Sequence, residues 1–179
     1  MLQDTPRLST DHARLAASLS ASERLLFIQD LDGVCMGLVR DPRTRRLERR
    51  YLDAAAQLAP DFYVLTNGEH DGERGVNGLV ETAYGDASIP RQTGRYLPGL
   101  GAGGVQLQDR HGVISHPGVS EREIRFLGQT PARARESLRE RLLQKRFDFL
   151  WPDLEALVSA CVLNNRVSPT LNLNPLHAR

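Results

Sequence analysis

Short apolar runs alternate with amphipathic segments along the first half of the chain. Residues 25–30 and 62–65 have the apolar composition of buried strands. Between them, apolar residues recur at helical spacing over 44–59, and Pro60 follows the last of them. A strand, a helix and a second strand in this order predict a βαβ unit, which builds a parallel sheet.

The remaining pattern predicts several helices and one hairpin. Residues 90–104 are rich in glycine and proline and indicate an irregular connection. The expected hairpin has strands over 104–108 and 113–116 around the turn 109–112. Expected helices cover 11–24, 71–84, 121–127, a segment that starts at Thr130 and Pro131 and reaches Leu143, and 154–161; the tail 171–175 alternates like a strand. These elements predict an α/β fold with a partial Rossmann-like parallel sheet, flanking helices and a hairpin.

Polar side chains and a glycine follow each of the two predicted strands. Asp30, Asp32 and Gly33 follow the first, and Thr66 and Asn67 follow the second. An Asp-x-Asp-Gly sequence is also an ordinary turn, so the spacing alone does not distinguish a site from a turn. Because neighbouring parallel strands end at one edge of a sheet, where ligands bind, we expect these polar side chains to converge there.

These four side chains suit phosphoryl transfer. One aspartate can attack phosphorus, and the other can protonate the leaving oxygen and later activate water. Carboxylates also suit Mg²⁺, which proteins hold with one or two carboxylates and substrate phosphate. Thr66 and Asn67 are neutral donors for phosphoryl oxygens.

Composition narrows the class of protein. A chain of 179 residues with 40% hydrophobic and 25% charged residues is typical of one globular domain. The net charge of +1 argues against nucleic acid or an anionic membrane as partner, and it predicts no particular oligomeric state. Two cysteines without paired spacing favour a reducing compartment, and neither a signal peptide nor a run of about 18 apolar residues is present in the sequence. We therefore expect a cytoplasmic protein.

Several charged residues have a simple structural interpretation. The arginine-rich stretches 43–50 and 133–141 are expected to be solvated helix faces, with Glu48 and Asp53 pairing in the first. The histidines at positions 70, 111 and 116 are expected at the surface or in turns.

Residues 69–71 and Cys35 lie beside the predicted site in the sequence. Residues 69–71 directly follow the second strand tip, so they either contact substrate or, for Asp71, cap a helix. Cys35 lies close to two carboxylates, which should raise the pKa of its thiol and make it unreactive.

Two motifs resemble a known superfamily. Residues 27–33, with their Asp-x-Asp-Gly-Val, and residues 63–68 are similar to the first and second signatures of haloacid-dehalogenase-like phosphatases. The resemblance implies that Asp30 is the nucleophile, Asp32 the general acid/base and Thr66 a phosphate-binding residue. It also implies that the Asp30 carboxylate and the Asp32 backbone carbonyl bind Mg²⁺.

Longer strings resemble one family within that superfamily. Residues 29–39, 65–78 and the glycine-rich 100–104 are similar to the glucosylglycerol 3-phosphate phosphatases. The resemblance implies a phosphomonoesterase that forms glucosylglycerol and phosphate through an aspartyl phosphate, in compatible-solute synthesis and salt tolerance. The alternatives are a phosphatase of another sugar phosphate, of the trehalose 6-phosphate type, or a catalytically incomplete fragment.

The sequence departs from the superfamily pattern after these motifs. The superfamily uses a later lysine or arginine and a later acidic pair, but Lys145 lies in an arginine-rich helical stretch and Asp86 has no second acid after it. These departures predict an N-terminal portion of a longer phosphatase. Residues 1–116 would form an incomplete core, and 117–179 a helical segment that begins a cap domain.

Overall fold

A five-stranded sheet forms the centre of the fold. The structure is a computed structural model and describes residues 11–39, 44–72, 74–144 and 151–177. In spatial order the strands are β1 (Phe27–Gln29), β2 (Phe62–Leu65), β3 (Gly99–Gly101), β4 (Gln106–Gln108) and β5 (Ile114–Ser115). The first three are parallel, and β4 and β5 form an antiparallel hairpin beside them. The predicted α/β class, parallel strand pair and hairpin are confirmed.

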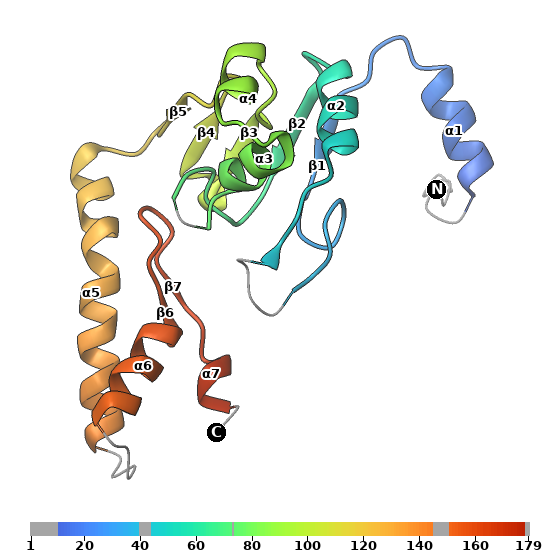
Figure 1. The fold of residues 1–179 in the computed structure, drawn as a ribbon. Coiled ribbons are helices and arrows are strands. Elements are labelled where there is room, and N and C mark those ends of the chain that lie inside the picture. The colour runs from blue at the N-terminus through green and yellow to red at the C-terminus, as the bar shows by residue number, and fades with distance from the viewer. Residues whose placement is uncertain (1–10, 40–43, 73, 145–150, 178–179) are drawn as a thin grey trace, which may run out of the picture.

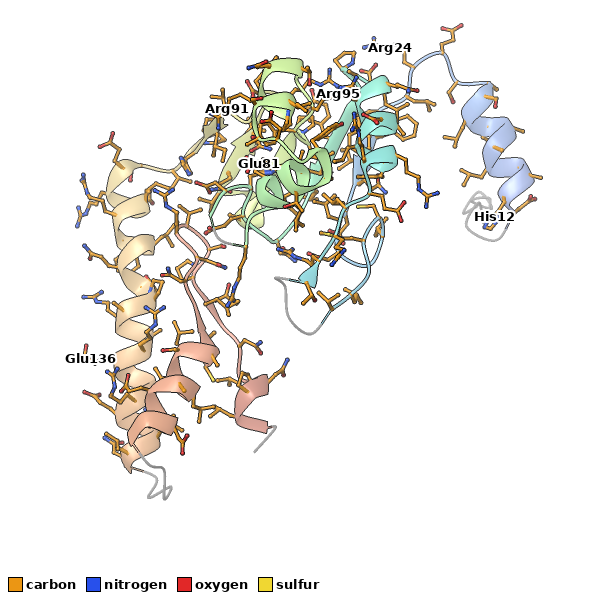
Figure 2. All side chains as sticks on the ribbon, in the orientation of Figure 1. His12, Arg24, Glu81, Arg91, Arg95 and Glu136 are labelled. Carbon is orange, nitrogen blue, oxygen red and sulfur yellow. The ribbon has the colours of Figure 1, made fainter. Side chains whose placement is uncertain are left out.

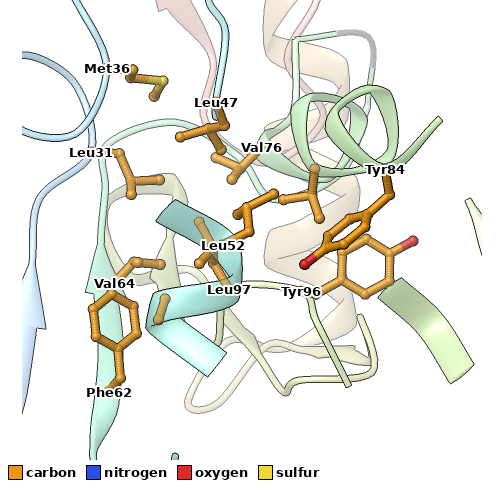
Figure 3. Close-up of a cluster of buried hydrophobic side chains, with 12 residues drawn as sticks. Leu31, Met36, Leu47, Leu52, Phe62, Val64, Val76, Tyr84, Tyr96 and Leu97 are labelled. Atoms are coloured by element: carbon orange, nitrogen blue, oxygen red, sulfur yellow. The ribbon is translucent and has the colours of Figure 1, made fainter. Parts of the chain in front are cut away.

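Three helices cover one face of this sheet (Figure 1). They are α2 (Arg49–Gln57), α3 (Val76–Tyr84) and α4 (Ser88–Thr93). Strand side chains that point to this face pack with helix side chains in one buried cluster (Figure 3), whose members include Leu31, Leu52, Phe62, Val64, Val76, Val80 and Leu97. At the rim of this layer, the hydroxyl of Tyr96 donates to Glu81 at 2.7 Å, and Arg95 lies 3.4 Å from Asp53 (Figure 2).

The opposite face of the sheet is apolar, and the residues that the structure describes leave it uncovered. Ile28 pairs with Tyr63, and Leu65 pairs with Leu100. The outward-pointing side chains of neighbouring strands therefore lie on the same face of the sheet. Ile28 is 63% exposed and Leu107 is 38% exposed, in the part of the chain that the structure describes. Parallel sheets normally have both faces covered. This face is therefore a surface that needs a cover.

The C-terminal third forms a separate layer around the long helix α5 (Figure 1). Its elements are α5 (Glu121–Gln144), α6 (Trp151–Cys161), the antiparallel pair β6 (Val162–Leu163) and β7 (Thr170–Leu171), and α7 (Asn174–His177). A second buried cluster joins α5 to α6 through Leu142, Leu154 and Val158. The guanidinium of Arg139 donates to both carboxylate oxygens of Glu155 at 2.5 and 2.8 Å, across the same contact.

The first helix of the described chain contributes no residue to either buried cluster. Helix α1 (His12–Ser20) is capped by Asp11, whose carboxylate accepts from the backbone N–H of Arg14 at 3.0 Å. None of its residues is buried. Local capping rather than packing therefore supports this helix.

One predicted loop contains the third parallel strand, so that interpretation was wrong. Residues 90–104 include the end of α4 and all of β3, which has the sequence Gly99-Leu100-Gly101. A Cβ atom on Gly99 would lie 2.0 Å from the carbonyl oxygen of Val64, and one on Gly101 would lie 2.7 Å from the ring of His70. The glycines that made the segment look irregular are the residues that let the strand approach its neighbours.

Two predicted helices and the tail also differ. The segments 121–127 and 130–143 form the single helix α5, which continues through Pro131 although that residue lacks the N–H for a bond to Leu127. Pro131 is buried, and the hydroxyl of Thr130 donates to the carbonyl of Phe126 in the same turn. In the tail, only the first residue of the expected strand pairs, and α7 follows.

We expect Gly99→Ala to lower the free energy of unfolding by about 3 kcal/mol or more, because φ is +136° and the new methyl group meets the β2 backbone. Gly78→Ala is the matched control. A Cβ atom there has nothing within 4 Å, so the substitution should stabilise α3 by about 0.5–1 kcal/mol. Urea unfolding followed by circular dichroism measures both. Equal midpoints for the two variants would contradict the close approach of β3.

Candidate active site

The predicted site residues follow two adjacent parallel strands. Gln29 of β1 pairs with Val64 of β2, so the chain leaves both strands at the same edge of the sheet. Asp30 comes directly after Gln29 at the end of β1, and Thr66 comes directly after Leu65 at the end of β2. This strand pairing is the geometric basis for treating the four polar residues as one site.

A tight turn holds the first aspartate pair. The backbone N–H of Gly33 donates to the carbonyl of Met36 at 2.8 Å, and Gly33 has a φ of +80° that favours glycine. Leu31 and Met36 are buried beneath the turn, whereas Asp30 is exposed and accepts from the N–H of Leu31 at 2.8 Å. The intervening apolar residue therefore anchors the turn while the carboxylates remain accessible.

The second strand tip has one buried and one exposed donor. Thr66 is 3% exposed, and its hydroxyl oxygen accepts from the backbone N–H of Gly68 at 3.2 Å. Asn67 is exposed beside it. Thr66 is thus held by its own turn, while the Asn67 amide faces the open side.

A cation that sequence reasoning missed joins the two tips. Arg45 was expected on a solvated face, but it is only 9% exposed, so that expectation was wrong for this residue. Its Nη1 lies 3.3 Å from Oδ2 of Asp32, and its Nη2 donates to the carbonyl of Arg74. The expected pairing of Asp53 is confirmed with Arg49, and Glu48 pairs with Arg50. Nothing in the local sequence distinguishes the buried arginine from its neighbours.

Arg45 also lies beside the second tip. A Cβ atom on Gly68 would be 3.8 Å from Nη1 of Arg45 and 3.6 Å from the hydroxyl oxygen of Thr66. The guanidinium therefore lies between Asp32 and the loop that follows β2. A positive charge at this point favours an anion at the edge of the sheet.

A polar cavity of about 190 Å³ opens at this edge. The lining on the side of the sheet consists of Arg45, Asn67, Gly68, Glu69, Asp71, Arg74 and Gly75. The side of the β6–β7 hairpin supplies Leu163, Asn164, Asn165 and Thr170. Asp30 and Asp32 do not line this cavity, and Arg45 is the residue that contacts both Asp32 and the cavity.

The residues that follow the second tip have structural partners. Glu69 is buried and accepts hydrogen bonds from the backbone of residues 166–168. Asp71 lies 3.1 Å from Nη1 of Arg166 and accepts from the amide of Gln106 at 2.7 Å. Gly75, not Asp71, is the N-cap residue of α3, so the capping alternative was wrong.

His70 is completely buried, which corrects the prediction of a surface position for it. Its backbone N–H donates to the side chain of Gln106 at 2.7 Å, and its Nε2 lies 3.1 Å from the carbonyl of Gly99. Burial lowers the pKa of His70 below the usual histidine range, despite the opposing effects of the Gly99 carbonyl and the Asp71 charge. The neutral ring packs β3 against the loop after β2.

The other predicted histidine and cysteine positions are partly confirmed. His111 is exposed in the β4–β5 turn, and His116 is half-buried. The pKa of the Cys35 thiol is raised, mainly by burial and to a smaller extent by Asp32 and Asp30. The direction agrees with the prediction, although desolvation outweighs the carboxylates.

The described residues offer an incomplete set of metal ligands. Asp30 has an exposed carboxylate suited to Mg²⁺, and the chain turns at Asp32 so that its carbonyl lies in the same loop. Within the described ranges, no group of three or more His, Cys, Asp or Glu side chains could hold a metal ion. Asp86 is exposed and accepts from the N–H of Ser88, and Lys145 lies outside the described residues. The Asp30 carboxylate and the Asp32 carbonyl therefore fit part of a metal site, and the remaining ligands would be groups other than the described His, Cys, Asp and Glu side chains.

Residues 24–179 match the family model for glucosylglycerol-phosphate phosphatase. The chain belongs to this family. It is also 49% identical over 176 residues to glucosylglycerol-phosphate phosphatase of Synechocystis sp. (strain ATCC 27184 / PCC 6803 / Kazusa). That alignment covers 98% of this chain and 42% of the relative. The chain thus spans less than half of the length of a glucosylglycerol-phosphate phosphatase.

Membership of the glucosylglycerol-phosphate phosphatase family confirms the resemblance that the strand-tip motifs indicated. Among the helices that the structure describes, none combines the length and apolar character needed to cross a membrane. The assignment of individual residues within the site remains a proposal.

Protonation of His70 should couple stability to pH. Below about pH 6.5 the unfolded chain binds a proton that the folded ring resists, so the free energy of unfolding should fall with pH, by up to about 1.4 kcal/mol per unit. Urea midpoints at about pH 7.5 and 5.5 measure the effect. His70→Gln should flatten the dependence, and His111→Gln should retain it. An equal loss of stability at low pH in wild type and in His70→Gln would exclude the buried ring as the cause.

Proposed function

We propose that the natural protein to which this chain belongs hydrolyses glucosylglycerol 3-phosphate to glucosylglycerol and inorganic phosphate. The supporting observation is the parallel pairing of β1 and β2, which delivers Asp30 and Asp32 beside Thr66 and Asn67, in a member of this phosphatase family. The relative's name supports the same substrate. The reaction would complete the synthesis of a compatible solute and so contribute to salt tolerance.

Asp30 is the proposed nucleophile and Asp32 the proposed acid/base. A carboxylate oxygen of Asp30 forms a bond to phosphorus while the ester P–O bond breaks. Asp32 gives a proton to the leaving ester oxygen, which departs as a hydroxyl group. Water then loses a proton to Asp32 and attacks the aspartyl phosphate, which releases phosphate and restores the Asp30 carboxylate.

Neutral donors and one cation would hold the phosphoryl oxygens. The hydroxyl of Thr66 and the amide of Asn67 are at the end of β2, and the buried guanidinium of Arg45 adds positive charge beside Asp32. Arg45 is thus a candidate for part of the charge neutralisation that the superfamily assigns to a later lysine or arginine. Preorganised donors of this kind act where charge develops in the transition state.

Mg²⁺ is the proposed cofactor, bound by the Asp30 carboxylate and the Asp32 carbonyl. When bound, it supplies charge neutralisation for the substrate phosphate. The exposed carboxylate of Asp30 and the accessible turn after β1 support this assignment.

The uncovered sheet face supports a second proposal, that the chain alone is catalytically incomplete. Its exposed residues include Ile28 of β1, the strand that carries the proposed nucleophile. We place the incomplete core at residues 1–116 and the beginning of a cap at 117–179.

We further propose that the protein acts in the cytoplasm. Its ligand would be a small sugar phosphate, and neither nucleic acid nor a membrane would be its partner. Trehalose 6-phosphate is the rival substrate, and a phosphate-release assay over a panel of sugar phosphates decides between them.

Asp30→Asn in the protein at its full natural length should reduce the release of phosphate by at least about 10³-fold, because an amide cannot act as the nucleophile. Asp86→Asn is the matched control, since Asp86 is exposed and bonds only to the local N–H of Ser88 among the contacts described. The variant should keep full activity. Retained turnover in Asp30→Asn, with an unchanged circular dichroism spectrum, would contradict the proposed nucleophile.

The chain of 179 residues should bind the apolar dye anilinonaphthalene sulfonate more strongly than the full-length protein does, because the outer sheet face is uncovered. Replacing Ile28 and Leu107 by threonine should reduce dye fluorescence, whereas Ala54→Ser on the opposite, helical layer should not. Equal dye binding by the short and long proteins would show that the longer chain leaves this face open.

A further inference from the structure

The tip of the β6–β7 hairpin is fixed to the loop that follows β2. One carboxylate oxygen of Glu69 accepts from the N–H groups of Val167 at 2.6 Å and Ser168 at 2.8 Å, and the other accepts from Arg166 at 3.1 Å. The hydroxyl of Ser168 adds a fourth hydrogen bond at 3.1 Å. These contacts join residues about 97–99 positions apart in the sequence.

The anchor is buried and charged. Glu69 is 6% exposed and Val167 is 5% exposed, so water does not compete for these hydrogen bonds. A carboxylate without donors would be costly at this burial, and three consecutive backbone N–H groups satisfy it. Arg166 adds an exposed ion pair with Asp71 beside the anchor. The hairpin therefore has a defined position relative to Asn67 and Gly68.

This position makes the hairpin one wall of the 190 Å³ cavity. On the opposite wall, Nη1 of Arg74 is buried and has no hydrogen-bond partner among the described residues. A buried guanidinium N–H without an acceptor indicates a place for a ligand oxygen. Arg45 and Arg74 thus bring two guanidinium groups to the cavity. The carboxylates of Glu69 and Asp71 also line it, but both bond to residues 166–168 of the hairpin tip. The residues that the hairpin contributes to the lining are uncharged.

The two asparagines on the hairpin wall have different roles. The amide of Asn165 donates within the tip, to the Ser168 carbonyl at 3.0 Å and at 3.3 Å to the hydroxyl of Thr170, so it shapes the turn. Asn164 is exposed to the cavity and makes no hydrogen bond with the described residues. An amide both donates and accepts, which suits hydroxyl groups that do the same.

We propose that the β6–β7 hairpin is the specificity element of this site, with Asn164 binding hydroxyl groups of the polyol part of the substrate and Glu69 as the positioning residue that holds the hairpin there. The phosphate end would lie at the edge of the cavity beside Arg45, the cavity residue that contacts Asp32. This inference rests on the proposed phosphatase function, but it assigns residues that the phosphoryl-transfer motifs do not contain.

Asn164→Ala tests the contact in the full-length protein. The variant should raise KM for glucosylglycerol 3-phosphate about tenfold, the loss expected for a hydrogen bond to substrate. Hydrolysis of p-nitrophenyl phosphate, which has no polyol, should stay within about twofold of wild type. Gln129→Ala, an exposed amide on α5, is the control and should change neither. An equal change, or no change, for both substrates would overturn the role of Asn164.

Glu69→Gln tests the anchor with an isosteric side chain. We expect a higher KM for the sugar phosphate, an unchanged kcat for p-nitrophenyl phosphate, and faster hydrogen exchange at the amides of residues 166–168. Ser168→Ala removes one of the four bonds and serves if Glu69→Gln does not fold. Glu136→Gln, on the exposed side of α5 (Figure 2), is the matched control. Unchanged exchange together with an unchanged KM would overturn the anchoring role.

Assays of the wild-type enzyme with both esters distinguish a failure of this inference from a failure of the proposed function. If wild type hydrolyses neither ester, the phosphatase proposal itself fails. If it hydrolyses both, and the hairpin variants do not alter the preference between them, only the specificity role of the hairpin fails.

Discussion

The parallel pairing of β1 with β2 is the constraint on which the rest of the site depends. Because Gln29 is opposite Val64, both strands end at one edge, and the polar residues that follow them are brought together without any further long-range contact. The turn at Gly33 and the hydroxyl bond of Thr66 then orient each tip locally. A shift of one residue in this pairing would exchange the buried and exposed sets of both strands and turn Thr66 out of its buried position.

Two longer contacts extend this edge into a cavity. Arg45, in the segment before α2, contacts Asp32 and the Arg74 carbonyl. Glu69 accepts hydrogen bonds from the backbone of the β6–β7 hairpin. Each places a charged group in a buried position, and each has several hydrogen bonds that satisfy the charge. The chemistry of the strand tips and the shape of the cavity therefore come from different parts of the chain, joined by these two side chains.

The same sheet has very different faces. Buried side chains of α2 and α3 pack on one, while Tyr63, Leu65 and Leu100 stay exposed on the other, in the described part of the chain. This asymmetry fits a protein of which a relative is more than twice as long.

The sequence by itself determined the elements whose signal is local. Apolar runs identified β1 and β2, turn chemistry identified the β4–β5 hairpin, and the position of Asp30, Asp32, Thr66 and Asn67 after the strands identified their shared edge. Tertiary structure decided what depends on distant contacts. Strand β3 was missed because its glycines are needed for close approach to Val64 and His70. Arg45 looked like an ordinary surface charge, and the position of Glu69 after β2 did not indicate its bonds to residues 166–168. Their burial results from segments that meet only after folding, which local periodicity and composition do not encode.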